Sequence, residues 1–255
     1  MIQERSDYMS DEKNISSWGE SESSSFIVGG NVFVPDRMRQ YNRICSLFPC
    51  INAPVSVLDL CCGEGLLSFE IAKRSSYYEM FCYDNSPLML ERAGKHLRQL
   101  PNKSHFKHFD LLNFEESEYP ANLGAVVSSL AIHHMEDSRK KDLFKFIYSM
   151  LPSNGLFVMV DVILPMCQEA TIVAAEDWDI AAYKQSVDFT GSLDAYKIFK
   201  EEKWNIYHYI DDKEYMAYDK PSTVYDQLKW LDEAGFSKVD VLWMYAGHVI
   251  LYGIK

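Results

Sequence analysis

The chain has 255 residues, 47% of them hydrophobic, and a formal net charge of −12, which suits one large domain with a buried core. It has no apolar run of about 18 residues that could span a membrane, and its polar start lacks the features of a secretory signal. None of the six cysteines forms a CxxC pair, so we expect reduced thiols and a cytoplasmic protein. The charge excludes nucleic acid as the favoured partner, because such binding relies on Lys and Arg clusters that neutralise phosphates.

Residues 1–25 hold six acids and two bases and show no apolar periodicity. This composition predicts a disordered acidic tail, with a flap that orders over a ligand as the alternative. Regular structure is predicted from Pro35, where a helix begins and runs from residue 37 to about 47. Its predicted buried face consists of Met38, Tyr41, Ile44 and Leu47.

From residue 55 onward, short apolar runs alternate with segments of helical spacing. Continuous apolar strands between helices are typical of a parallel sheet that is buried on both faces, and right-handed crossovers make this an α/β, Rossmann-like doubly wound fold. The predicted strands are 55–60, 80–83, 105–108, 124–129 and 155–164. The predicted helices are 66–73, 87–97 and 141–151.

The alternation stops between about 165 and 220. This stretch carries twelve acids, six lysines and many aromatic residues, and Ala174, Trp178, Ala181 and Ala182 share one helical face. We interpret it as a helical insertion within one domain that covers residues 26–255.

The alternation returns with a predicted helix over 222–234, which Gly235 ends as a left-handed cap. Two more strands follow, 238–243 and 247–252. The few residues between them leave no room for a crossover helix, so this last pair is predicted to be antiparallel.

Two segments have the arrangement of a nucleotide-type cofactor site. The first predicted strand ends in Asp59, and a tight turn follows with Gly63 and Gly65, whose lack of a side chain lets the backbone approach a ligand closely. The second strand ends in Asp84, followed by Asn85, and an acid at this interval can accept both hydroxyls of a ribose. This spacing alone does not distinguish S-adenosylmethionine from NAD.

Together these residues resemble the class I S-adenosylmethionine-dependent methyltransferase superfamily, over roughly residues 33–164 and 221–255. In that family the turn usually reads Gly-x-Gly-x-Gly, whereas here Cys61 replaces the first glycine and can crowd the methionine end of the cofactor. The resemblance implies S-adenosylmethionine as the cofactor and an antiparallel final strand. Its implied cofactor residues are Tyr41, Asp59, Cys61, Gly63, Gly65, Asp84, Asn85, Met89, Asp110, Leu111 and Ser129.

The segment after the fourth strand, Ser128 to His134, resembles the part of small-molecule methyltransferases that lines the exposed methyl group. A hydroxyl acceptor also needs a general base, and histidine is a common choice near neutral pH. His133 and His134 are the candidates, with His133 slightly favoured; a capping or core role is the alternative. No clear metal-ligand set is spaced along the sequence, so we expect no metal, although Asp110 and the two histidines could meet in space.

The acceptor is expected to be a small molecule or a peptide, of aromatic, apolar or cationic character, because aromatic faces near acids attract cations. The candidate acceptor residues are Trp178, Tyr183, Trp204, Tyr207, His208 and Tyr245. The alternative is that most of the aromatic residues of the insertion pack as a lid on the sheet, and the rest form the acceptor pocket. The methylated atom and the oligomeric state are left open.

Three other functions share parts of this sequence pattern. The first is a noncatalytic protein that binds S-adenosylmethionine. It would keep Asp84 and Asp110 but would need no open path for an acceptor to reach the methyl group. A nicotinamide-dependent oxidoreductase is disfavoured because a third glycine at the dinucleotide spacing is missing. A nucleic-acid methyltransferase is disfavoured by the charge and by Ser128-Ser129-Leu130 in place of an Asn/Asp-Pro-Pro-Tyr type motif.

Overall fold

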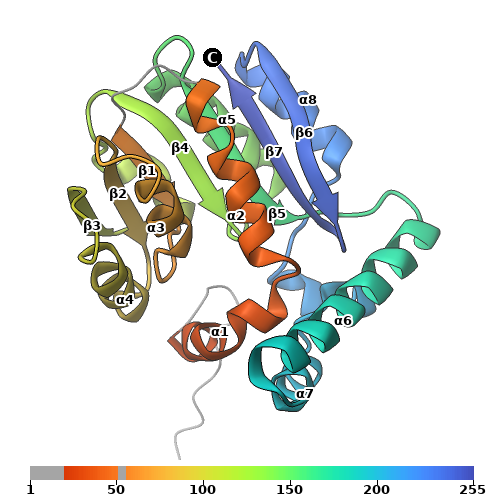
Figure 1. The fold of residues 1–255 in the computed structure, drawn as a ribbon. Helices are drawn as coiled ribbons and strands as arrows, with labels where there is room; N and C mark the ends of the chain where they lie inside the picture. The colour runs from red at the N-terminus through yellow and green to blue at the C-terminus, as the bar shows by residue number, and fades with distance from the viewer. Residues whose placement is uncertain (1–19, 51–55) are drawn as a thin grey trace, which may run out of the picture.

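The computed structural model describes residues 20–50 and 56–255, and its centre is a seven-stranded sheet with the order β3-β2-β1-β4-β5-β7-β6 (Figure 1). The predicted tail of residues 1–25 lies largely outside the described residues. The strands are β1 (Ser56–Leu60), β2 (Glu79–Asp84), β3 (Ser104–His108), β4 (Leu123–Ser129), β5 (Leu156–Val162), β6 (Lys238–Tyr245) and β7 (His248–Ile254).

Strand direction follows from how the strands are connected. The pairs β1·β2, β1·β4, β2·β3 and β4·β5 are parallel, and helices join them. β7 is antiparallel to both β5 and β6, because only Ala246 and Gly247 separate it from β6. The predicted α/β fold with an antiparallel last strand is therefore confirmed.

Helices cover both faces of the sheet (Figure 1). One face packs on α2 (Arg37–Cys45), α3 (Leu66–Ala72) and α4 (Pro87–Leu97), and the other on α5 (Asp137–Met150) and α8 (Val224–Ala234). A hydrophobic cluster fills each space, with Ile71 and Val127 at 0% exposure in the first and Phe144 and Phe157 at 0% in the second. Strands that are buried on both faces explain the continuous apolar runs in the sequence.

The predicted face of the first helix is wrong at Met38, which is 45% exposed, while Tyr41, Ile44 and Leu47 are buried. Each step of three residues falls about 60° short of a full turn in a 3.6-residue helix. Four positions in such steps therefore span half the circumference, and the first of them faces solvent.

Three further helices lie together beyond the carboxyl ends of the parallel strands (Figure 1). They are α1 (Glu20–Phe33), α6 (Gln168–Thr190) and α7 (Asp194–Glu201). A third hydrophobic cluster joins them, with Phe33, Trp178 and Phe199 at its centre. These helices are placed over the edge of the sheet at which α/β proteins bind ligands.

Among the described residues a helix is already present from Glu20, which corrects the prediction that regular structure begins near Pro35 and places residues 20–25 in a helix. This helix was not predicted because it has no clear apolar stripe and its last turn is held by side chains of α6. No helix among residues 20–50 and 56–255 is both long and apolar enough to cross a membrane.

Candidate active site

The turn after β1 has the backbone shape that its glycines allow. Gly63 and Gly65 adopt φ values of +54° and +74°, and a Cβ on Gly65 would stand 2.8 Å from the Cβ of Ala93 on α4. Cys61 has a φ of 59°, a left-handed conformation that costs a residue with a side chain roughly 1–2 kcal/mol. The turn therefore has left-handed residues at positions 61, 63 and 65, and two of these are glycines.

Asp84 is aimed at this turn from the end of β2. Its Oδ2 accepts from the Gly63 amide at 2.8 Å and its Oδ1 accepts from the Ser86 amide at 2.9 Å. These bonds fix the carboxylate, and an ionised carboxylate oxygen has acceptor capacity beyond one bond. A ribose is a suitable further partner.

The space above Gly63 is bordered by Met89 and open to a flat ligand. A Cβ added to Gly63 would have the Met89 sulfur as its nearest neighbour, at 4.0 Å. Met89 is 2% exposed and lies in the first turn of α4, where its amide donates to the Ser86 hydroxyl. Asn85, just before this helix, is exposed. The turn, the acid and this apolar side chain together fit an adenosine group.

Helix α2 reaches the same turn through an ion pair. Arg37 lies 3.7 Å from the Glu64 carboxylate and donates through Nε to the Tyr41 hydroxyl at 2.8 Å. Tyr41 is 2% exposed, so its ring packs in the core and its hydroxyl points toward the guanidinium. Its predicted contact with the cofactor remains a prediction.

Asp59 is fully buried, and its Oδ2 accepts from the Ser68 hydroxyl at 2.6 Å. Burial raises the pKa of Asp59 to about 7, and the Ser68 hydrogen bond acts in the opposite direction. A carboxyl with this pKa becomes ionised readily when a cation approaches it. The charged amino group and sulfonium of S-adenosylmethionine would be such cations.

Asp110 serves as a cap in this structure. Its Oδ1 accepts from the Leu112 amide at 2.9 Å and its Oδ2 from the Asn113 side chain at 2.7 Å, which starts the 3-10 turn η2 (Leu111–Glu116). Leu111 is partly buried in the second cluster, and Ser129 is partly exposed at the end of β4. The adenine-side role of these three residues remains a prediction.

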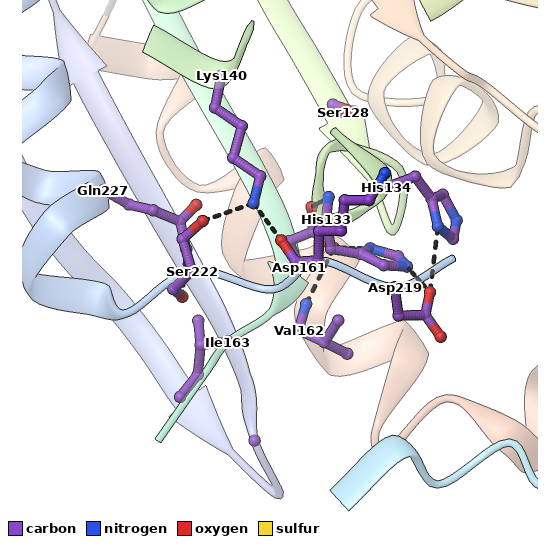
Figure 2. A network of polar contacts seen from close by, with 12 residues as sticks. Ser128, His133, His134, Lys140, Asp161, Val162, Ile163, Asp219, Ser222 and Gln227 are labelled. Atoms are coloured by element: carbon purple, nitrogen blue, oxygen red, sulfur yellow. Dashed lines mark hydrogen bonds and ion pairs between the residues drawn. The ribbon is translucent and has the colours of Figure 1, made fainter. Parts of the chain in front are cut away.

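The two histidines belong to a cluster with two carboxylates, at the carboxyl ends of β4 and β5 (Figure 2). The Nδ1 of His133 lies 2.5 Å from Oδ1 of Asp161, and its backbone amide donates to Oδ2 of the same residue at 2.9 Å. On the other side, Asp219 Oδ1 lies 3.4 Å from His133 Nε2 and 3.1 Å from His134 Nδ1. Both imidazoles are therefore turned toward one carboxylate.

Charge in this cluster is distributed unequally. Burial opposes protonation of His133, but the carboxylates of Asp161 and Asp219 outweigh it and raise the pKa of His133 to about 9. Burial and then the neighbouring His133 lower the pKa of His134. Burial would raise the pKa of Asp219, yet its contacts with both histidines lower it. The cluster thus stabilises a positive charge between its two carboxylates.

Asp219 comes from the predicted insertion, and a buried lysine fixes its segment. Lys140 of α5 is 1% exposed, and its ammonium donates to the Lys220 carbonyl and to the Ser222 hydroxyl. The Lys220 amide donates to the His133 carbonyl at 2.8 Å. This anchoring places the Asp219 carboxylate against the histidines.

Several predicted acceptor residues are used in packing. Trp178 donates through Nε1 to the Phe33 carbonyl at 2.7 Å. The Tyr207 hydroxyl lies 2.7 Å from the carbonyls of both Ile163 and Gly247, and the Trp204 ring stands 5.0 Å from that of Phe33. These contacts join the insertion to α1 and to the sheet.

The other predicted acceptor residues are more accessible. Tyr183 is 47% exposed, and its ring meets that of Tyr196 edge to face. His208 pairs with Asp179 at 2.9 Å on the surface, and Tyr245 is partly buried beside the third cluster. The structure does not gather all six aromatic candidates into one pocket, and acceptor binding by any of them stays a prediction.

Sequence reasoning missed Asp161 and Asp219. Asp161 is 2% exposed within β5, and a carboxylate inside an otherwise apolar run is the signal that could have revealed it, because buried acids are nearly always paired. Asp219 gave no such signal, since it lies in an irregular segment far along the chain from the histidines.

Comparison with known proteins agrees with this geometry. Residues 57–155 match a family model described as a methyltransferase domain. This match runs from Val57 in β1 to the residue before β5 and includes the glycine turn, Asp84 and the histidine pair. Residues 57–155 therefore form a methyltransferase domain, and the fold of the chain is that of S-adenosylmethionine-dependent methyltransferases. Its cofactor is S-adenosylmethionine.

Curated relatives of this methyltransferase differ in their reactions. A carboxy-S-adenosyl-L-methionine synthase of Nautilia profundicola is 22% identical over 78% of this chain and 76% of its own length. An uncharacterized methyltransferase of Mycobacterium bovis is 36% identical over 32% of this chain and 39% of its own. These names leave the methyl acceptor of this chain open.

Solved structures with this fold include an O-methyltransferase family 2 protein from Planctomyces limnophilus in complex with apigenin. It superimposes with a TM-score of 0.63 at 14% identity, over 95% of this chain and 63% of its own. Human N-acetylserotonin methyltransferase superimposes with a TM-score of 0.53 at 13% identity, over 92% of this chain and 54% of its own. The methyltransferase spans about half to two thirds of the length of these structures, and the likeness shows the fold.

Proposed function

We propose that this enzyme transfers the methyl group of S-adenosylmethionine to a hydroxyl-bearing small molecule. The observation that carries the proposal is the cluster of His133, His134, Asp161 and Asp219. It lies at the same edge of the sheet as the glycine turn, and Asp219 brings the insertion to this edge (Figure 2). An acceptor held between the turn and the cluster would have its reacting atom near groups that handle a proton.

The chemistry is an in-line displacement on an activated donor. The acceptor oxygen forms a bond to the methyl carbon as the carbon–sulfur bond breaks, and the electron pair of that bond stays on sulfur to give S-adenosylhomocysteine. The hydroxyl proton leaves through the histidine cluster to solvent. The protein contributes mainly orientation, which can supply several kcal/mol of the barrier, and removal of that proton.

The names of solved neighbours support a small, partly aromatic acceptor. The Planctomyces protein is described in complex with apigenin, and two others act, by their names, on N-acetylserotonin and on magnesium protoporphyrin IX. The insertion of this chain is rich in aromatic side chains near acids, such as Tyr183, Tyr209 and Asp179. Phenolic or amine-bearing aromatic molecules are therefore the first acceptors to screen.

The test begins with binding. Calorimetric titration of S-adenosylmethionine, S-adenosylhomocysteine and NAD into the enzyme and into Asp84→Ala should show that the first two bind the native enzyme. They should bind Asp84→Ala about tenfold or more weakly, because hydrogen bonds to a charged group contribute about 1.5–3 kcal/mol. NAD should bind neither protein.

The acceptor screen then uses mass spectrometry of both products. S-adenosylhomocysteine together with a methylated acceptor supports the proposal, and Asp84→Ala should form both more slowly. Binding of S-adenosylmethionine with no turnover over a broad screen would favour the noncatalytic alternative. A carboxylated cofactor in place of S-adenosylhomocysteine would place this enzyme with the Nautilia relative and contradict methyl transfer.

A further inference from the structure

Three possible metal-ligand atoms of the histidine cluster converge on one point. His133 Nε2, His134 Nδ1 and an oxygen of Asp219 all lie within 4.8 Å of one another. Each of these three atoms carries a lone pair when its group is in its metal-binding form. This arrangement needs a positive charge at its centre, which a proton on His133 supplies when no ion is bound and which a metal ion would supply with both histidines neutral.

The separations match the edges of a coordination shell. Ligand atoms about 2.0–2.1 Å from a tetrahedral Zn²⁺ lie about 3.4 Å from one another. Asp219 Oδ1 stands 3.4 Å from His133 Nε2 and 3.1 Å from His134 Nδ1. Small movements of the side chains would suffice to close the three atoms around one ion.

Asp161 fixes the orientation of the His133 ring, as a carboxylate does for ligating histidines in many metal sites. The Nδ1 of His133 donates to Asp161, which leaves Nε2 as the nitrogen that faces Asp219. Asp161 also accepts the amides of His133 and Val162, each at 2.9 Å. Ligating histidines almost always have such a carboxylate or carbonyl on their other nitrogen, which fixes the ring and its tautomer.

We propose that His133, His134 and Asp219 form a site for a divalent transition-metal ion. Two imidazoles and one carboxylate suit zinc or iron(II) better than magnesium or calcium. Three protein ligands leave at least one position open, as in catalytic rather than structural sites. The side chains of the three ligands are 11%, 19% and 13% exposed, so a small molecule can reach that position.

The metal would hold the oxygen of the acceptor and would promote loss of its proton in place of a proton-accepting histidine, and this part of the inference rests on the proposed function. A hydroxyl bound to the ion loses its proton to solvent more easily, because the cation stabilises the oxyanion that remains. The acceptor class then narrows to molecules with an oxygen that can coordinate a metal, such as a phenol, an enol or a 2-hydroxy acid.

The experiment is a cobalt(II) titration of the full chain after treatment with a chelator, followed by visible absorption and calorimetry. The native protein should bind one equivalent and develop the intense bands of a low-symmetry cobalt site. Asp219→Asn and His134→Gln should bind about tenfold or more weakly, and Asp161→Asn should lose about 10- to 100-fold.

The matched control is His105→Gln. His105 is also paired with a carboxylate, Glu79, at 2.8 Å, but on the exposed surface of the sheet edge. This variant should bind cobalt as the native protein does. Titration of S-adenosylhomocysteine into each variant checks its folding independently of the metal.

The outcomes distinguish the two proposals. Equal cobalt binding by Asp219→Asn and the native protein, with cofactor binding intact, would overturn the metal site. Absence of cobalt binding by the native protein would do the same, and methyl transfer in the presence of chelator would then leave the proposed function standing. Cobalt binding without any turnover would support the site and count against the function.

Discussion

At the scale of single residues, Gly65 shows how one position serves both the fold and the cofactor turn. It needs a left-handed backbone, and its hydrogen lies where a methyl group would meet Ala93. Gly191 also has a positive φ, of +68°, but no atom lies within 4 Å of a Cβ built there. An alanine at position 191 would therefore cause backbone strain only, whereas an alanine at position 65 would cause backbone strain and a steric clash.

Replacing these glycines by alanine should give different losses of stability. Gly191→Ala should lower the free energy of unfolding by about 1 kcal/mol, from backbone strain alone. Gly65→Ala should lower it by about 2–4 kcal/mol, because overpacking adds to the strain, and should also weaken cofactor binding. Urea unfolding and calorimetry measure both effects, and equal losses for the two variants would contradict the steric argument.

At the scale of elements, α1 depends on side chains of α6 to complete its last turn. The Gln185 side-chain amide donates to the carbonyls of Val32 and Val34 at 2.8 and 3.0 Å, and its oxygen accepts from the Asp36 amide at 2.7 Å. Carbonyls at a helix end have no partner within the helix. Gln185 and Trp178 therefore donate hydrogen bonds to the last carbonyls of α1, which in other helices a C-terminal glycine cap satisfies with backbone amides.

Gln185→Leu should loosen α1 without unfolding the sheet. The lost bonds and the unpaired carbonyls should cost about 1–3 kcal/mol, and the opening should be local because few strands contact α1. Hydrogen exchange should show reduced protection over residues 26–36, while the strands keep theirs. The neighbouring Lys184→Leu, at an exposed position of α6, is the control and should leave the exchange of α1 unchanged.

The same helix shows the limit of reading elements from the sequence. The five parallel strands and their helices were predicted because apolar runs and helical spacing are local signals. α1 was missed because its stabilising partners, Gln185 and Trp178, lie about 150 residues along the chain. The histidine pair was predicted, but its carboxylate Asp219 was not, for the same reason: the contact is made by the fold and leaves no local pattern.

At the scale of the whole molecule, the buried Tyr207 hydroxyl joins the insertion to the sheet. It lies 2.7 Å from the carbonyls after β5 and before β7, and the third cluster includes Val162 and Ala246 from the same strand ends. The insertion shares a core with the sheet, so we expect one cooperative unfolding transition.

Tyr207→Phe tests this connection. It leaves the Ile163 carbonyl in the core without the hydroxyl that it receives now, so the free energy of unfolding should fall by about 1–3 kcal/mol. Tyr183→Phe removes an exposed hydroxyl and should change it by less than about 0.5 kcal/mol. Urea unfolding followed by both tryptophan fluorescence and circular dichroism should show coincident curves; separate transitions would mean that the insertion unfolds independently.

The placement of Asp219 has a consequence for how this enzyme can diversify. The segment that follows the helices of the insertion provides a carboxylate to the histidines, and Lys140 of α5 holds that segment in place. Replacing the whole insertion with that of a relative would therefore change the acceptor selectivity and also the carboxylate beside the histidines in one step. Single substitutions on the outer faces of α6 and α7 leave residues 219–222 in place. We therefore expect acceptor selectivity to evolve more readily through such substitutions.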